Sequence, residues 1–452
     1  MGAERTMSHR LILVLPLALA ACGTGRLDPF EKVPPAALRP PEHPAEQCDA
    51  VDTDETKSFV PAALEPVSTG LSAWSSGEFQ IEWAPYPLWY PDARQWAIWG
   101  KGLIASNGRH YSAVGDGDSA GDDTPRDGNT VLYEFDPVLG RLRAVGDVLT
   151  ASGNHVPGEN GYAKIQARIS EGPCGLLYMH SYWGSPRFVT YTGNYQGDLL
   201  LRYNPWTKGL ESLGTKIFQM GVPSIALFRP DRMIYGTAST PTEPRETIFW
   251  AYAIDSDSVV FQSPRRQATD KHIALDRDGH AYYSGIGSSL MRYDPASNTE
   301  TVLADFSGGG TLRGSTRPVA DGSLLLITVE PNEVYRLDPL AGALTLLATL
   351  PRQASDVELD PTERVAYFVP VGLDGRPSFE LYELDRTSGS IRMLLDLGAA
   401  LVAAGTGAPR GSYTIDVTPD GRTLYVTPNS GEPDGFGVPL FVAVHLPDSA
   451  LP

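Results

Sequence analysis

The sequence predicts an all-β protein whose body, from about residue 77 to residue 452, is a seven-bladed β-propeller with four-stranded antiparallel blades. Two repeated signatures and a high content of Gly and Pro predict this fold. The 46 Gly and 38 Pro favour many short strands joined by turns over long helices. The first signature is an apolar strand that ends in Asp or Asn, whose side chain bonds the backbone of a following tight turn. It recurs at Leu132–Asp136, Leu201–Asn204, Tyr252–Asp255, Met291–Asp294, Val334–Asp338 and Leu381–Asp385.

The second signature is a hairpin of two strands around a polar turn, and it occurs seven times. Its copies are Leu103–Tyr111, Ala167–Tyr178, Ile225–Tyr235, Ile273–Tyr283, Arg317–Ile327, Val357–Tyr367 and Ile415–Tyr425. Asp-Gly and Asn-Gly turns are typical of hairpins. Four short strands in a repeat of about 40–50 residues are what a propeller blade requires. The alternatives are a parallel β-helix, whose repeats would be shorter, or a sandwich, whose strands would not be self-similar.

The first and last strands of the predicted propeller are expected to form one blade together. After Tyr425 the chain has a single further apolar run, Leu440–Val444, so the seventh blade lacks an outer strand. Phe79–Trp83 precedes the first blade and has no hairpin partner. We therefore predict that Phe79–Trp83 pairs beside Phe441–Val444 and closes the ring.

Two short sequence motifs of the repeat resemble those of a known group of propellers. Arg292–Pro295 reads Arg-Tyr-Asp-Pro, and Asp278–Tyr282 follows the pattern Asp-Gly-x-x-Tyr. They resemble the superfamily that contains NHL, YVTN and virginiamycin B lyase-like repeats, over about residues 77–447. The resemblance implies the fold. It leaves the function open, because this scaffold hosts enzymes, binding proteins and assembly factors alike.

The N-terminus has the pattern of a targeting segment. Arg5 and Arg10 precede the apolar run Leu11–Ala21, which is too short to span a bilayer. The following Cys22 completes a stretch that resembles the bacterial lipobox. The resemblance implies that residues 1–21 are a signal peptide and that Cys22 carries lipid, including acyl chains such as palmitate. It also implies a location in the cell envelope, with the outer membrane favoured because Gly23 stands where inner-membrane lipoproteins have Asp. An ordinary signal peptide cut nearby is the alternative.

Residues 22–76 are rich in Pro and weakly periodic, which predicts an extended tether.

A net charge of −18 argues against nucleic acid as a partner, because nucleic acid requires clustered Lys and Arg. Two cysteines remain after Cys22, and in an oxidising compartment Cys48 and Cys174 are expected to form a disulfide, with two free thiols as the alternative. We expect no cofactor, because no nucleotide-binding or zinc-binding spacing occurs.

Aligning the seven inner strands gives two sets of candidate channel residues. The position at which the strands begin is always polar: Lys101, Gln166, Ser224, His272, Ser315, Asp356 and Thr414. Two residues further on stand Leu103, Arg168, Ala226, Ala274, Arg317, Glu358 and Asp416. Because side chains alternate along a strand, one face of each inner strand meets the blade core and the other meets the channel. Either these charges pair with each other, or they bind a ligand at the mouth of the channel.

Two long loops add candidates. In blade two, His180, Tyr182 and Trp183 suit stacking on a sugar, unless they only pack the loop. We expect His272, Arg317 and Asp356 to converge near Trp183. The segment Asp116–Asp127 partly matches a calcium loop but lacks a closing Glu, so a flexible acidic loop is the alternative.

The favoured function is the binding of a protein or saccharide ligand at the channel mouth. The alternative is a lyase or hydrolase acting on a carbohydrate or lactone. In such an enzyme His272 would be the base, and Lys101, Arg168 or Arg317 would hold a carboxylate of the substrate. Metal-dependent propeller lyases gather several His or Glu at the mouth, so a single His among the aligned positions predicts no metal site.

Overall fold

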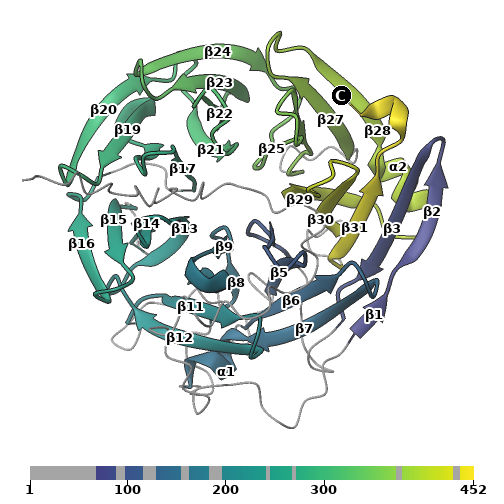
Figure 1. Ribbon diagram of the computed structural model, residues 1–452, viewed down its shortest axis with the longest axis horizontal. Helices are drawn as coiled ribbons and strands as arrows, with labels where there is room; N and C mark the ends of the chain where they lie inside the picture. Colours follow the sequence, from purple (N-terminus) through teal and green to yellow (C-terminus); the bar gives the residue numbers. More distant parts are fainter. Residues whose placement is uncertain are drawn as a thin grey trace, which may run out of the picture.

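The computed structural model describes residues 68–87, 97–115, 129–153, 162–182, 196–240, 245–266, 271–372, 379–430 and 438–451. The chain forms seven antiparallel sheets, which Figure 1 shows arranged in a ring. The inner strands of the ring surround a central channel. The predicted seven-bladed propeller is confirmed.

Each blade runs from an inner strand at the channel to an outer strand at the rim of the ring, and its strands are named in that order. Blade one consists of β4 (Leu103–Ile104), β5 (His110–Gly115), β6 (Thr130–Asp136) and β7 (Arg141–Asp147). Blade two consists of β8 (Lys164–Ile165) and β9 (Ser170–Glu171), which both pair with β10 (Leu177–Tyr182), then β11 (Leu199–Asn204) and β12 (Gly209–Thr215). Blade three consists of β13 (Gly221–Phe228), β14 (Met233–Ser239), β15 (Thr247–Ala253) and β16 (Ser258–Gln262). Blade four consists of β17 (Ile273–Leu275), β18 (Ala281–Ser284), β19 (Ser289–Asp294) and β20 (Thr299–Asp305).

Blade five consists of β21 (Thr311–Ser315), β22 (Leu324–Val329), β23 (Glu333–Asp338) and β24 (Ala343–Thr349). Blade six consists of β25 (Glu358–Leu359), β26 (Val365–Phe368), β27 (Glu380–Asp385) and β28 (Ile391–Asp396). Blade seven consists of β29 (Pro409–Val417), β30 (Thr423–Ser430), β31 (Leu440–His445) and β3 (Phe79–Pro85). Two short helices, α1 (Val148–Ser152) and α2 (Leu397–Ala403), follow the outer strands of blades one and six. Single 3-10 turns lie at Pro173–Gly175, Ile286–Ser288 and Asp448–Ala450. None of the described helices is long and apolar enough to cross a membrane.

The Asp at the end of the third strand has the predicted local role in blades one and six. Asp136 Oδ1 accepts hydrogen bonds from the backbone N–H of Val138 at 3.0 Å and of Leu139 at 3.2 Å. Asp385 makes the same pair of bonds to Thr387 and Ser388. The side chain therefore holds the turn into the outer strand, which explains why the signature recurs.

The ring closes as predicted. In blade seven β3 pairs with β31, with Ile81 opposite Val444 and Trp83 opposite Val442. Figure 1 shows the purple β3 beside the yellow β31. The sheets also begin earlier than the predicted boundary at residue 77. Strand β2 (Ser72–Ser76) pairs with β3, and β1 (Ser68–Gly70) pairs with β7, so the N-terminal segment joins the outer edges of blades seven and one.

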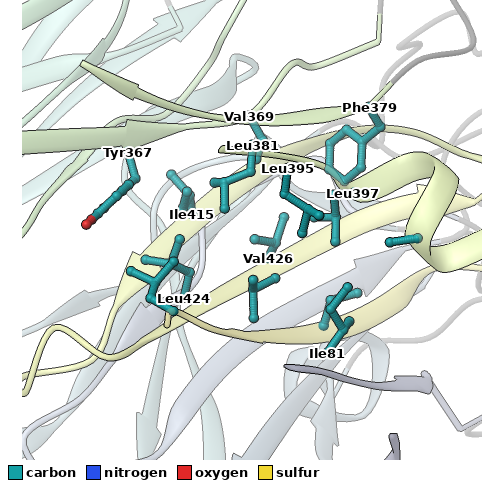
Figure 2. Close-up of a cluster of buried hydrophobic side chains, with 14 of the residues drawn as sticks. Ile81, Tyr367, Val369, Phe379, Leu381, Leu395, Leu397, Ile415, Leu424 and Val426 are labelled. Atoms are coloured by element: carbon teal, nitrogen blue, oxygen red, sulfur yellow. The ribbon is translucent and has the colours of Figure 1, made fainter. Parts of the chain in front are cut away.

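The core of the described residues is divided into seven apolar clusters, each between two neighbouring blades. Figure 2 shows the cluster between blades six and seven, where Leu424 and Val426 pack with Tyr367 and Leu381. Burial of each such side chain contributes about 1.5–3 kcal/mol. Because each blade is held from both sides, the inner strands and the channel residues they carry are rigidly placed.

Candidate functional site

The central channel contains a cavity of about 740 Å³. It extends from the leading end, where the inner strands begin, to the turn end, where they turn into the second strands. Gln166 and Ser224 line it at the leading end, and Ser106 and Asp420 line it at the turn end. Most of the aligned positions predicted from the sequence therefore contribute to the wall of one cavity, whereas Asp356, Thr414 and Ala274 are not among its lining residues.

Four of these residues form the leading-end cluster, which consists of Lys101, His272, Ser315 and Asp356. Lys101 Nζ lies 3.1 Å from Asp356 Oδ1 and 3.2 Å from His272 Nδ1. His272 Nε2 lies 2.8 Å from Ser315 Oγ. All four side chains are buried. Lys101 thus connects blade one to blades four and six across the channel.

Burial and neighbouring cations fix the protonation of this cluster. Burial, followed by the charge of Lys101, lowers the pKa of His272 well below its usual value, so the imidazole is neutral. Burial lowers the pKa of Lys101 to about 8, although Asp356 opposes this shift. A charged Lys101 can only donate, so His272 Nδ1 accepts and His272 Nε2 carries the proton that it donates to Ser315. His272 therefore cannot accept a proton from Ser315 while Lys101 is charged.

A second row of charges lies next to this cluster. Arg168 Nη2 lies 3.5 Å from Asp356 Oδ1 and 3.7 Å from Glu358 Oε2. Asp416 Oδ2 lies 3.0 Å from His110 Nε2. Arg168, Glu358 and Asp416 all line the cavity. Lys101, Arg168, Asp356 and Glu358 are therefore paired with one another, as the first of the two sequence-based alternatives predicts, while Asp416 pairs with the buried His110.

The predicted convergence of His272, Arg317 and Asp356 is wrong for Arg317. Arg317 lines the cavity, but its Nη1 lies 2.7 Å from Oε1 of Glu363, in the turn between the first two strands of blade six. This carboxylate holds the guanidinium toward the turn end. The leading-end cluster forms without Arg317.

The aromatic candidates of blade two do not line the described cavity. His180 is fully buried with its ring edge-on to Trp250 of blade three, at 6.1 Å between centroids. Burial lowers the pKa of His180 to about 4, so it is a neutral core histidine and its predicted position at the mouth is wrong. Tyr182 is buried with Lys164 Nζ 5.2 Å from its ring centre. Trp183 lies outside the described residues.

Cys174 is disulfide-bonded and stands in the turn between the first two strands of blade two. Its predicted partner Cys48 lies outside the described residues, as do Cys22 and the segment Asp116–Asp127, so the pairing, the lipidation and the calcium loop stay predictions. Within the described ranges no group of three or more His, Cys, Asp and Glu is placed to hold a metal ion.

The cavity continues sideways at the turn end into a groove between blades one and seven, which we call the seam groove. Its apolar lining consists of Leu71, Phe135, Pro137, Val138, Leu139 and Tyr425. Its polar lining includes Thr423, His445 and Glu82. Thr423 Oγ1 lies 3.0 Å from His445 Nδ1, and His445 Nε2 lies 3.1 Å from Glu82 Oε2.

The alignment of the inner strands does not predict Thr423, His445 and Glu82 as site residues, because none of them belongs to an inner strand. A signal was nevertheless present. The predicted pairing of Phe79–Trp83 with Phe441–Val444 already places Glu82 and His445 on adjacent strands.

No family model and no curated protein matches the chain. Solved structures do resemble it. A catalytically inactive virginiamycin B lyase from Staphylococcus aureus with quinupristin has a TM-score of 0.53 at 11% identity, covering 81% of this chain and 99% of that one. An oligogalacturonate lyase in complex with manganese has a TM-score of 0.53 at 10% identity, covering 85% and 99%. A chain of a mitotic checkpoint complex has a TM-score of 0.52 at 11% identity, covering 86% and 96%. At such identities the likeness concerns the fold alone.

Proposed function

We propose that the protein is a lipid-anchored protein of the bacterial cell envelope whose propeller binds a saccharide in the channel cavity. The observation that carries this proposal is a cavity of suitable size lined by charges that are already paired. Small-molecule sites typically enclose about 300–1,000 Å³. The cavity and the seam groove together have a volume of about 740 Å³, so the channel part fits a short saccharide and not a folded domain. Of the two predicted ligand classes, the saccharide is therefore favoured.

The paired charges favour a neutral ligand. A charged ligand would take Glu358 or Arg168 away from its partner and leave a charge uncompensated, which costs about 3–5 kcal/mol where the pair is buried. Hydroxyl groups can instead donate to Glu358 and Asp416 and accept from Arg168 while the pairs stay intact. A hydroxyl-rich neutral sugar matches this lining.

The test is calorimetric titration of the purified protein with a panel of neutral oligosaccharides. Ser224 lines the cavity and is buried, so Ser224→Phe should fill the site and abolish binding, whereas Ser224→Thr should preserve it. Equal affinity of the Phe variant and the wild type would place the ligand outside the cavity. The absence of binding across the panel would refute the saccharide proposal.

The anchor is tested separately. Cys22→Ser should leave the chain unlipidated and release it from membranes during fractionation. Unchanged fractionation of this variant would contradict lipid anchoring.

We also propose Cys48 as the partner of Cys174. The turn that holds Cys174 lies at the turn end, so this disulfide would tie the tether to that end and direct the leading end away from the membrane. Mass spectrometry of peptides from the unreduced protein should find the Cys48–Cys174 linkage, and a free Cys48 would refute it.

A second candidate is a lyase, favoured because Lys101 lines the cavity and burial lowers its pKa to about 8. A lysine that is neutral at mildly alkaline pH can remove a proton beside a carboxylate or ester carbonyl. It is a better base than His272, whose Nδ1 is occupied by Lys101. Oligogalacturonides should then yield an unsaturated, ultraviolet-absorbing product at a rate that increases through pH 8 and is lost in Lys101→Met. No such product at any pH would exclude this candidate.

A further inference from the structure

We infer that Thr423, His445 and Glu82 act as nucleophile, base and orienting carboxylate in the hydrolysis of a carboxylic ester whose apolar part lies in the seam groove. The inference does not rest on saccharide binding, because its residues are on the second to fourth strands of blade seven rather than on the inner strands.

The three residues stand on adjacent strands of one sheet. Thr423 of β30 is directly opposite His445 of β31. Glu82 of β3 is opposite Ala443, two residues before His445, so both side chains are on the same face. The contacts of 3.0 Å and 3.1 Å therefore follow from the strand register.

The proton arrangement is that of a base. The Glu82 carboxylate can only accept, so it holds the ring proton of His445 on Nε2. Nδ1 then carries the lone pair and accepts a hydrogen bond from the Thr423 hydroxyl. A hydroxyl bonded to an imidazole that a third group orients is the arrangement of an activated nucleophile.

The groove beside this array is apolar and partly open to solvent. Val138 is 73% exposed and Leu139 is 64% exposed at its rim. Phe135 and Tyr425 line its inner wall. Apolar side chains exposed at the rim of a groove suit contact with an apolar ligand group. The substrate class is therefore an ester with an alkyl or aryl acyl group.

The reaction balances without a co-reactant other than water. Thr423 Oγ attacks the carbonyl carbon while its proton moves to His445 Nδ1. The ester C–O bond breaks, and the alcohol leaves with that proton. Water then gives a proton to His445 and attacks the acyl-threonine, which releases the carboxylic acid and restores Thr423. Because His445 and Glu82 are 37% and 40% exposed, water screens their interaction, so we expect slow turnover.

The first experiment measures hydrolysis of p-nitrophenyl butyrate by the full-length protein and labelling by a fluorophosphonate probe. We expect label on Thr423, loss of label and at least a tenfold lower rate in Thr423→Ala and His445→Gln, and retained activity in Thr423→Ser. The control is Ser449→Ala, which removes a hydroxyl that donates to the Glu78 carboxylate rather than to an imidazole. Hydrolysis that persists in Thr423→Ala, or a label elsewhere, would overturn the inference.

The second experiment tests the groove. Val138 and Leu340 occupy the same position in the Asp-Pro-x-x-Gly turns of blades one and five, but only Val138 lines the cavity. Val138→Asp should raise KM for the butyrate ester at least fivefold and leave the melting temperature unchanged. Leu340→Asp, at a fully exposed residue, should change neither. Equal KM values for the two variants would remove the groove from the proposal.

Discussion

The cavity has a hydroxyl–imidazole pair at each end, and the two pairs differ in the group on the far ring nitrogen. At the leading end His272 binds Ser315 on one nitrogen and the Lys101 ammonium on the other. At the turn end His445 binds Thr423 on one nitrogen and the Glu82 carboxylate on the other. An ammonium forces the imidazole to donate to its hydroxyl, and a carboxylate leaves it able to accept. The sign of the third group therefore decides whether such a pair can act as nucleophile and base.

The two ends also differ in burial. Lys101, His272 and Asp356 are buried, whereas His445 and Glu82 are over a third exposed. Charges withdrawn from water depend strongly on their partners, and exposed pairs contribute little to stability. Substitutions at the leading end should therefore lower the free energy of unfolding, whereas substitutions at the turn end should affect only the reaction.

The largest effect is expected for Asp356→Ala. This change leaves Lys101 without its carboxylate partner inside the channel and should lower the free energy of unfolding by about 3–5 kcal/mol. Denaturant titration of the variant and the wild type measures it. Asp448→Ala is the control, because it breaks a pair with Arg422 in which Asp448 is 85% exposed, and it should change the free energy of unfolding by less than about 1 kcal/mol. Equal losses in the two variants would mean that the channel pairs are not what stabilises the leading end.

A smaller effect is expected from pH. The pKa of Lys101 is about 8 in the fold and lower than its ordinary 10.5, so between these values the unfolded chain binds more protons than the folded one. The stability contribution of Lys101 should therefore rise as pH increases through this window. Denaturant titrations at several pH values in that window should show less of this rise in Lys101→Met than in the wild type. Parallel profiles for the two proteins would contradict the assigned burial of the ammonium.

Periodicity allowed the sequence to predict the ring order and the aligned channel positions, because these depend only on strand alternation and turn chemistry. The pairing across the channel could not be predicted in the same way. Lys101 contacts His272, three blades away in the ring, and Asp356, two blades away. These contacts form only because the ring closes, and no pattern of neighbouring residues encodes them.

The two misplaced residues show the same limit. Arg317 is held by Glu363, which belongs to the turn of the neighbouring blade. His180 belongs to β10, the second strand of blade two. The two faces of this strand meet the adjacent blades rather than the channel, so the ring of His180 packs on Trp250 of blade three. Strand alternation predicts that a side chain lies on one of two faces, but the identity of the facing element comes only from the assembled ring.

The smallest change in stability, and the sharpest test of the comparison, is expected for Glu82→Lys. The new ammonium can only donate to His445 Nε2, so Nδ1 must carry the ring proton and donate to Thr423, as His272 does to Ser315. The turn end would then have the proton arrangement of the leading end. Because Glu82 is 40% exposed, the free energy of unfolding should change by less than about 1 kcal/mol. Fluorophosphonate labelling of Thr423 should nevertheless be lost, while Glu82→Gln, which keeps an acceptor oxygen, should retain part of it. Wild-type labelling in Glu82→Lys would show that the group on the far nitrogen does not control this hydroxyl.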